Sequence, residues 1–315
     1  MKRAFVFPGQ GSQAVGMGKA LAEGFPQARA VFDEVDAALS QKLSTLMWEG
    51  PAEELTLTAN AQPALMAVSL AAMRVLESEA GLDLTRHAAF VAGHSLGEYS
   101  ALAAAGSLSI PDTARLLRVR GNAMQSAVPV GQGAMAALLG LEYDAALEVA
   151  REAAQGEVCD AANDNGGAQV VVSGTKSAVE RAVAIAQARG AKRAVMLPVS
   201  APFHCGLMAP AAEAMREALA TVTVNAPAVP VVANVEARPI MAPDAIRDAL
   251  VRQVTGTVRW RESVAFMAAQ GVETFYEVGA GKVLTGLVKR IAAGATGSAI
   301  GTPDDVAAFR ASLRQ

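Results

Sequence analysis

Short apolar segments alternate with helical patterns along most of the chain. Apolar runs at 4–7, 90–93, 229–233 and 274–278 predict buried strands. Apolar residues at helical spacing predict helices at 27–39, 62–79, 111–127, 207–219, 243–253, 261–269, 283–291 and 303–313, with Pro63 in the first turn of the second of these. Because strands and helices alternate, we predict an α/β fold whose mostly parallel sheet is covered by helices.

A β-α-β-β-α-β pattern interrupts this core in the middle of the chain. It consists of predicted strands at 134–139, 158–162, 169–172 and 194–199 and predicted helices at 144–154 and 177–188. This order is typical of a ferredoxin-like unit, and the Asn- and Gly-rich stretch 163–167 suits the hairpin between its middle strands. We therefore predict two domains, a core formed by 1–127 and 199–315 and a ferredoxin-like subdomain at 128–198.

The turn after the second core strand carries the strongest candidate chemistry. Gly93-His94-Ser95-Leu96-Gly97 joins the strand at 90–93 to an alanine-rich helix that ends near residue 105. Such a turn presents the serine hydroxyl above the sheet edge, and the next backbone N–H lies at a helix N-terminus, where it can bind an oxyanion. Glycines flank Ser95 because a sharp reversal leaves no room for Cβ atoms. Ser95 is therefore the candidate nucleophile.

The chain has three histidines that could act as the base for this serine, namely His87, His94 and His204. A serine hydroxyl needs an adjacent base to be nucleophilic at neutral pH. His94 directly precedes Ser95, so its side chain should diverge from the serine, and His87 lies in a polar connection where we expect exposure to solvent. His204 lies in a proline-bounded loop before a helix. Elimination favours His204 as the base, although a lone histidine is often structural.

The acidic member of a Ser-His-Asp triad is not evident. In α/β-hydrolases the acid lies between the serine and a histidine near the C-terminus. Here His204 is far from the end of the chain, and the segment between Ser95 and His204 is the ferredoxin-like unit. This arrangement argues against an ordinary esterase. A backbone carbonyl could orient the imidazole instead, which would give a Ser–His dyad.

Arg120 lies on the apolar side of the predicted helix 111–127. It shares a stripe with Leu117, Gly121 and Met124 at helical spacing. An arginine in this position either extends past the edge of the core, or pairs with a buried carboxylate of the protein. The functional alternative is a guanidinium reserved for a substrate carboxylate, which it can bind in a bidentate manner.

Composition excludes several classes of protein. Apolar residues make up 52% of the chain and charged residues 18%, so a large core can form. The net charge of −3 and the absence of any block of like charge argue against nucleic acid as a partner. No apolar run approaches the ~20 residues that span a bilayer, so we expect no membrane association. Cys159 and Cys205 match no metal-ligand spacing, and we expect a cytoplasmic protein without a metal site.

Several segments, spread in order along nearly the whole chain, carry a family resemblance. They are FPGQGSQ at 7–13, GHSLGEY at 93–99, RGNAMQ at 120–125, SAPFHC at 200–205, ALVRQ at 249–253 and YEVGAGKVL at 276–284. In combination they resemble the malonyl-CoA:acyl carrier protein transacylases of type II fatty acid synthesis. The chain departs from the usual pattern of that family in two loops, at 163–169 and at Gly256-Thr257.

The resemblance implies a hydrolase-like catalytic core with an inserted ferredoxin-like subdomain. Ser95 would take the malonyl group from coenzyme A as an ester, with His204 as general base and then general acid. The backbone carbonyl of Gln253 would orient His204. Transfer of this kind alternates between two large thiol substrates at one site.

The resemblance also assigns the groups that bind the acyl chain. The backbone N–H groups of Gln10 and Leu96 would form the oxyanion hole, and Arg120 would pair with the malonyl carboxylate. Phe203, beside the base, either narrows the pocket against branched acyl groups or merely packs. The implied partners are malonyl-CoA, as a substrate rather than a cofactor, and acyl carrier protein. We expect no cofactor, and a monomer.

Three other functions remain open at this stage. A serine thioesterase or esterase would use the same Ser95 and His204, but Arg120 and the position of His204 in the chain disfavour it. The malonyl transferase of a polyketide pathway would share the fold and the residues. A binding protein without enzymatic activity is the most distant alternative.

Overall fold

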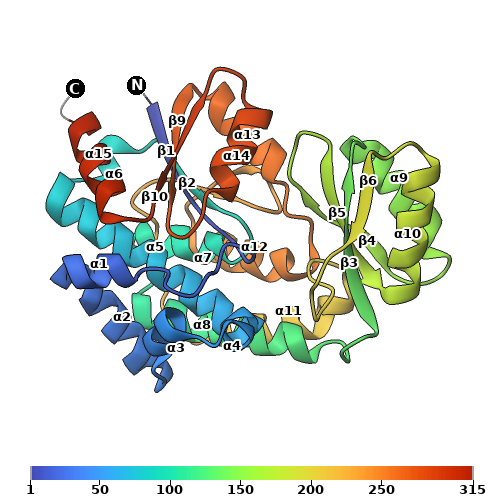
Figure 1. Cartoon of the computed structure of the whole chain (residues 1–315), viewed down its shortest axis with the longest axis horizontal. Helices are drawn as coiled ribbons and strands as arrows, with labels where there is room; N and C mark the ends of the chain where they lie inside the picture. The colour runs from blue at the N-terminus through green and yellow to red at the C-terminus, as the bar shows by residue number, and fades with distance from the viewer. Residues whose placement is uncertain (1, 314–315) are drawn as a thin grey trace.

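Two separate β-sheets organise the chain (Figure 1). The computed structural model describes residues 2–313. The larger sheet has six strands, in the order β10 (Thr296–Ile300), β9 (Val272–Val278), β1 (Lys2–Phe7), β2 (Phe90–Gly93), β7 (Val231–Ala233) and β8 (Arg238–Ile240). Its first five strands are parallel, and β8 returns antiparallel to β7.

Helices cover both faces of this sheet, because its strands carry apolar side chains on both sides. On β1, Phe5 and Phe7 pack against a large helical layer, whereas Ala4 and Val6 face the layer that contains Trp260. The large layer is built mainly from α1 (Lys19–Gly24), α2 (Pro26–Leu39), α3 (Leu43–Glu49), α4 (Ala52–Thr56), α5 (Thr58–Ala80), α7 (Gly97–Ala104), α8 (Ile110–Ser126), α11 (Ala209–Ala220), α12 (Pro243–Thr255) and α15 (Pro303–Leu313). The second layer consists of α13 (Trp260–Ala269) and α14 (Val283–Ile291).

The smaller sheet forms a body of its own beside the core (Figure 1). Its strands are antiparallel in the order β4 (Cys159–Asp164), β5 (Gln169–Thr175), β3 (Gly133–Leu139) and β6 (Arg193–Met196). Helices α9 (Tyr143–Ala154) and α10 (Lys176–Ala188) pack on the sheet around a separate apolar core. This is the ferredoxin-like topology, so the predicted fold class is confirmed.

Several local predictions were wrong. Helix α5 begins at Thr58, so Pro63 lies in its second turn rather than its first. The predicted hairpin loop at 163–167 starts later, because Asn163 and Asp164 still belong to β4. The predicted strand at 194–199 already ends at Met196. The sequence pattern also missed β8, β10, α1, α3, α4 and α6 (Leu84–His87), which are short elements held mainly by tertiary contacts.

No helix within residues 2–313 combines the length and the apolar character that crossing a bilayer requires.

Candidate active site

Ser95 lies at the tip of the turn between β2 and α7, in a left-handed backbone conformation with φ of 52°. A non-glycine residue in this conformation is strained and persists only where its surroundings enforce it. The two flanking glycines allow the turn to form. A Cβ atom on Gly93 would lie 1.8 Å from the carbonyl oxygen of Gly97, and one on Gly97 would lie 2.2 Å from that of Phe7. The predicted reason for these glycines is thus present in the structure.

The His204 side chain lies next to Ser95, although the two residues are far apart in sequence. The Nε2 atom of His204 lies 2.7 Å from Ser95 Oγ. Its Nδ1 atom lies 2.8 Å from the backbone carbonyl oxygen of Gln253, which leaves Nδ1 as the donor and Nε2 as the acceptor for the serine hydroxyl. The orienting group is therefore a carbonyl, and the pair is a dyad.

The environment of His204 keeps its imidazole neutral. Burial, reinforced by the nearby Arg120 guanidinium, lowers the pKa of His204 to about 3. At neutral pH the ring is consequently in the form that can accept a proton from Ser95. An imidazolium formed during reaction would still donate its Nδ1 proton to the Gln253 carbonyl.

Arg120 projects from α8 into the same site, and its side chain is only 1% exposed. Its Nη1 donates to Gln62 Oε1 at 2.7 Å. Its Nη2 donates to Gln253 Oε1 at 2.8 Å and to Ser95 Oγ at 3.1 Å. Within residues 2–313 no carboxylate forms an ion pair with it, so the buried-carboxylate alternative is wrong. The guanidinium is held by neutral oxygens, and its charge is not compensated by direct contact.

A buried polar network behind Ser95 was not predicted from the sequence. The Nε2 of Gln253 donates to the Ser95 carbonyl oxygen and to Glu98 Oε2, at 3.0 and 2.9 Å. Asn234 Oδ1 accepts from Ser95 N at 2.9 Å, and Asn234 Nδ2 donates to Gly93 O at 2.7 Å. Burial raises the pKa of Glu98 to about 7. The position of Glu98 inside an apolar helix was a usable signal, whereas Asn234 gave none.

The other two histidines do not contact Ser95. His94 turns away, as predicted, and its Nε2 lies 2.8 Å from Asn165 Oδ1 in the smaller domain. His87 is partly buried rather than exposed, and its Nδ1 accepts a hydrogen bond from the backbone N–H of Asp83 at 3.0 Å. The prediction that His87 faces solvent was wrong.

A cavity of about 410 Å³ opens above the dyad, between the two domains. Its walls include Ser95, His204 and Arg120, and the two predicted oxyanion-hole residues, Gln10 and Leu96, line it as well. Gln253 is fully buried and lies outside the lining. The remaining walls are largely apolar and include Met124, Met135, Val171, Leu197, Val199, Phe203 and Leu287. Such a cavity, mostly apolar with a few convergent polar groups, is typical of a small-molecule binding site.

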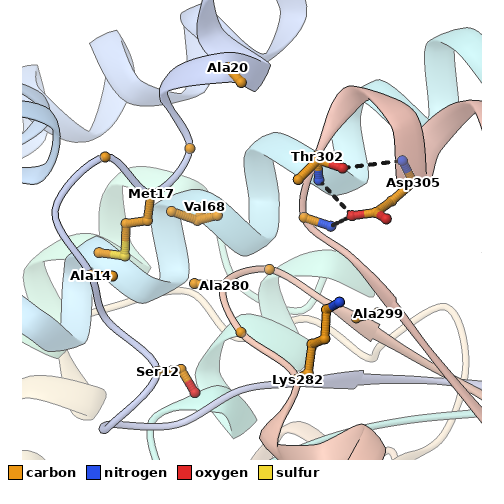
Figure 2. A pocket seen from close by; sticks show the side chains of 15 residues that line it. Ser12, Ala14, Met17, Ala20, Val68, Ala280, Lys282, Ala299, Thr302 and Asp305 are labelled. Carbon is orange, nitrogen blue, oxygen red and sulfur yellow. Dashed lines mark hydrogen bonds between the residues drawn. The ribbon is translucent and has the colours of Figure 1, made fainter.

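A second cavity, of about 320 Å³, lies at the carboxyl ends of β1, β9 and β10 (Figure 2). Its lining is mostly glycine and alanine. On one side of it, Asp305 Oδ2 accepts from the N–H groups of Gly301 and Thr302. Its lining contains neither histidine nor cysteine. Elsewhere, residues 2–313 hold no cluster of side chains suited to a metal ion.

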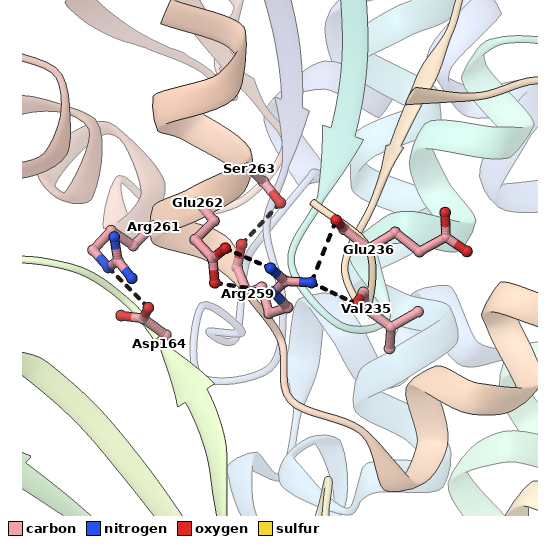
Figure 3. A network of polar contacts seen from close by, with 7 residues as sticks. All are labelled: Asp164, Val235, Glu236, Arg259, Arg261, Glu262 and Ser263. Carbon is pink, nitrogen blue, oxygen red and sulfur yellow. Dashed lines mark hydrogen bonds and ion pairs between the residues drawn. The ribbon is translucent and has the colours of Figure 1, made fainter. Parts of the chain in front are cut away.

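The smaller domain is fixed to the core beside the active site. Asp164 N donates to Val258 O at 2.9 Å, and Val258 N donates to Ala162 O at 2.8 Å. The edge strand β4 thus pairs, in parallel, with the segment after α12. Figure 3 shows the ion pair between Asp164 and Arg261, 2.8 Å long, that closes this junction. The same segment leads back to Gln253, which orients His204. The junction therefore ties the cavity wall to the Ser95–His204 pair.

Comparison with known proteins identifies the family. The protein-family model described as the acyl transferase domain matches residues 4–300. The chain belongs to the acyl transferase family. This agrees with the resemblance that the sequence motifs carry.

Relatives within the acyl transferase family match the chain over nearly its full length. The malonyl CoA-acyl carrier protein transacylase of Escherichia coli (strain K12) is 52% identical, with 97% of each chain covered. The crystal structure of the acyl-carrier-protein-S-malonyltransferase from Bartonella henselae has a TM-score of 0.97 and 57% identity, with both chains fully covered. A malonyl-transacylase in complex with its type II polyketide acyl carrier protein has a TM-score of 0.95 and 43% identity, over 99% of this chain and 100% of that one.

Proposed function

We propose that the chain transfers the malonyl group from malonyl-CoA to the phosphopantetheine thiol of acyl carrier protein, through an ester on Ser95. One observation carries the proposal. Ser95 Oγ lies between a neutral imidazole, 2.7 Å away, and a buried guanidinium, 3.1 Å away, that has no carboxylate partner within residues 2–313. The site thus combines an activated nucleophile with a receptor for an acidic acyl group.

In the first half-reaction Ser95 Oγ attacks the thioester carbonyl while His204 Nε2 takes the hydroxyl proton. The backbone N–H groups of Gln10 and Leu96 bind the oxyanion that forms, a contribution of ~3–4 kcal/mol for each donor in comparable sites. The C–S bond then breaks, and His204 returns the proton to the sulfur of coenzyme A. The malonyl group remains on Ser95.

The second half-reaction runs the same steps with the carrier protein as the nucleophile. His204 takes the proton of the phosphopantetheine thiol, and the sulfur attacks the ester carbonyl. The C–O bond to Ser95 breaks, and His204 delivers the proton to Oγ. One site therefore serves both thiols in turn, as in ping-pong kinetics.

Arg120 supplies selectivity in this scheme. A malonyl carboxylate would compensate its charge, whereas an acetyl group would leave the buried guanidinium unpaired. The chemistry requires no cofactor beyond the thioester substrate. Every group that the scheme uses comes from one chain, so we expect a monomer to be active.

Fatty acid synthesis is the favoured context. The transacylase of Escherichia coli covers the chain at 52% identity, which exceeds the 43% of the neighbour that is bound to a polyketide carrier protein. A polyketide-pathway malonyl transferase is the second candidate. Rates with carrier proteins of the two kinds would distinguish them.

Intact-mass measurement after brief incubation with malonyl-CoA tests the proposal. We expect a malonyl adduct on the wild-type chain and none on Ser95→Ala. Release of free malonate without a detectable adduct would support a thioesterase instead. Absence of any turnover of malonyl-CoA would contradict both functions.

A further inference from the structure

Gln62 is the hydrogen-bond acceptor for the Nη1 group of Arg120. It lies in the second turn of α5, and its side chain is 1% exposed. Its Oε1 accepts from Arg120 Nη1 at 2.7 Å. Sequence reasoning assigned no role to Gln62, because its partner lies on another helix.

The orientation of the Gln62 amide is set by a chain of hydrogen bonds. Gln62 Nε2 donates to Thr58 Oγ1 at 2.9 Å, and this hydroxyl donates its own proton to Gln10 Oε1 at 3.0 Å. Turning the amide over would place its NH₂ group against the guanidinium donors. These hydrogen bonds therefore keep the Gln62 carbonyl oxygen directed at Arg120, and they link Arg120 to the loop that carries Gln10.

The charge of this partner is as important as its position. An amide oxygen accepts the hydrogen bond from Arg120 but adds no negative charge, and the second amide, on Gln253, does the same. Glu98 reaches Arg120 only through the Gln253 amide. A carboxylate at position 62 would have the same shape and would neutralise the guanidinium, as internal ion pairs do.

We propose that Gln62 is a specificity-determining residue that orients Arg120 while leaving its positive charge available to the acyl carboxylate. This inference rests on the proposed function, since it concerns the choice between malonyl and uncharged acyl groups. Gln62 also lines the cavity, but its amide oxygen is directed at Arg120, so in this inference it is a positioning residue that acts through Arg120. A residue that merely packs would be insensitive to charge. At position 62, by contrast, a change of charge at constant side-chain shape should change the ratio of malonyl to acetyl transfer.

The test compares Gln62→Glu with Gln62→Met. For each variant kcat/KM is measured with malonyl-CoA and with acetyl-CoA, with holo-acyl carrier protein as acceptor. In Gln62→Glu we expect malonyl transfer to fall by about 100-fold while acetyl transfer changes less than about 5-fold, because a desolvated charge pair replaces the free cation. Gln62→Met leaves the cation unpaired, and its malonyl-to-acetyl ratio should fall less than about 10-fold.

Two results would overturn the inference. One is a wild-type ratio in Gln62→Glu, and the other is an equally large fall of the ratio in Gln62→Met. If Gln62→Glu does not fold, Gln62→Met still tests the inference, because it removes the amide without adding charge. A fall of its malonyl-to-acetyl ratio by about 100-fold would show that the ratio follows the position of Arg120 and not the charge of its partner, and would contradict the inference. Failure of the wild-type chain to accept malonyl at all would refute the proposed function, which is a distinguishable result.

Discussion

Replacing Arg120 with alanine should convert a malonyl-selective site into one that prefers uncharged acyl groups. The variant removes the guanidinium that lies 3.1 Å from Ser95 Oγ, and it leaves the dyad of Ser95 and His204 in place. Malonyl transfer therefore loses the partner of its carboxylate. Acetyl transfer loses only a buried cation that has no counter-ion in that complex.

The magnitude follows from the burial of the side chain. Arg120 is 1% exposed, so a carboxylate that reaches it forms a desolvated, charge-assisted pair. Losing one partner of such a pair costs about 2–5 kcal/mol, which corresponds to about 30-fold to a few thousand-fold. The lost side chain also leaves a space that water can enter, and water can hydrate part of the exposed carboxylate. We therefore expect the lower part of this range, about 100-fold in kcat/KM.

The assay measures kcat/KM with malonyl-CoA and with acetyl-CoA on the same preparations, with thermal unfolding as a check on folding. Arg115→Ala is the matched control, because Arg115 lies on the same helix with its side chain 55% exposed and pairs with Asp112. The control should retain wild-type selectivity. Equal losses of malonyl and acetyl transfer in Arg120→Ala would refute the selector role and would indicate general damage to the site.

Three further predictions concern pH and stability. Because the pKa of His204 is lowered to about 3, its base form persists at mildly acidic pH, and the acylation rate measured by stopped flow should not fall between pH 7 and pH 5; a limb near pH 6.5 would contradict this. Gly97→Ala would place a Cβ atom 2.2 Å from a backbone carbonyl oxygen of β1, so its free energy of unfolding in denaturant should fall by about 3 kcal/mol or more. Gly286→Ala is the control, because a Cβ atom there would lie in open space on α14. It should raise the free energy of unfolding by up to about 1 kcal/mol. Comparable losses of stability in both variants would contradict the steric argument. Asp164→Asn weakens the pair with Arg261, and we expect a loss of about 1–3 kcal/mol by the same measurement; an unchanged midpoint would show that the main-chain hydrogen bonds alone hold the junction.

The parts of the fold that the sequence predicted are those with strong local signals. The strand at 90–93, the glycines around Ser95 and the following helix are specified by neighbours in sequence, and the structure has all of them. The β-α-β-β-α-β order likewise follows from periodicity. The early start of α5 was missed, because Thr58 is helical where it is buried against other elements. Strand β10 was missed because its sequence, TGSAI, is mostly small and polar, and it is a strand through its pairing with β9.

The site divides in the same way. Ser95, His204 and Arg120 could be singled out by motif, by elimination and by an unusual place on a helix. Gln62 and Asn234 could not, because their importance lies in hydrogen bonds to residues that are distant in sequence, such as the bond from Ser95 N to Asn234 Oδ1. Polar residues of this kind carry no local pattern, and only the folded arrangement shows their partners.

Transfer from an isolated acyl-enzyme tests the central claim most directly. The chain is incubated with malonyl-CoA, freed of small molecules, and mixed with holo-acyl carrier protein, and both proteins are followed by intact mass. We predict that the malonyl mass leaves the enzyme and reappears on the carrier protein in equal amount, and that apo-acyl carrier protein, which lacks the thiol, receives none. Loss of the malonyl mass as free malonate, with none on the carrier protein, would contradict the account.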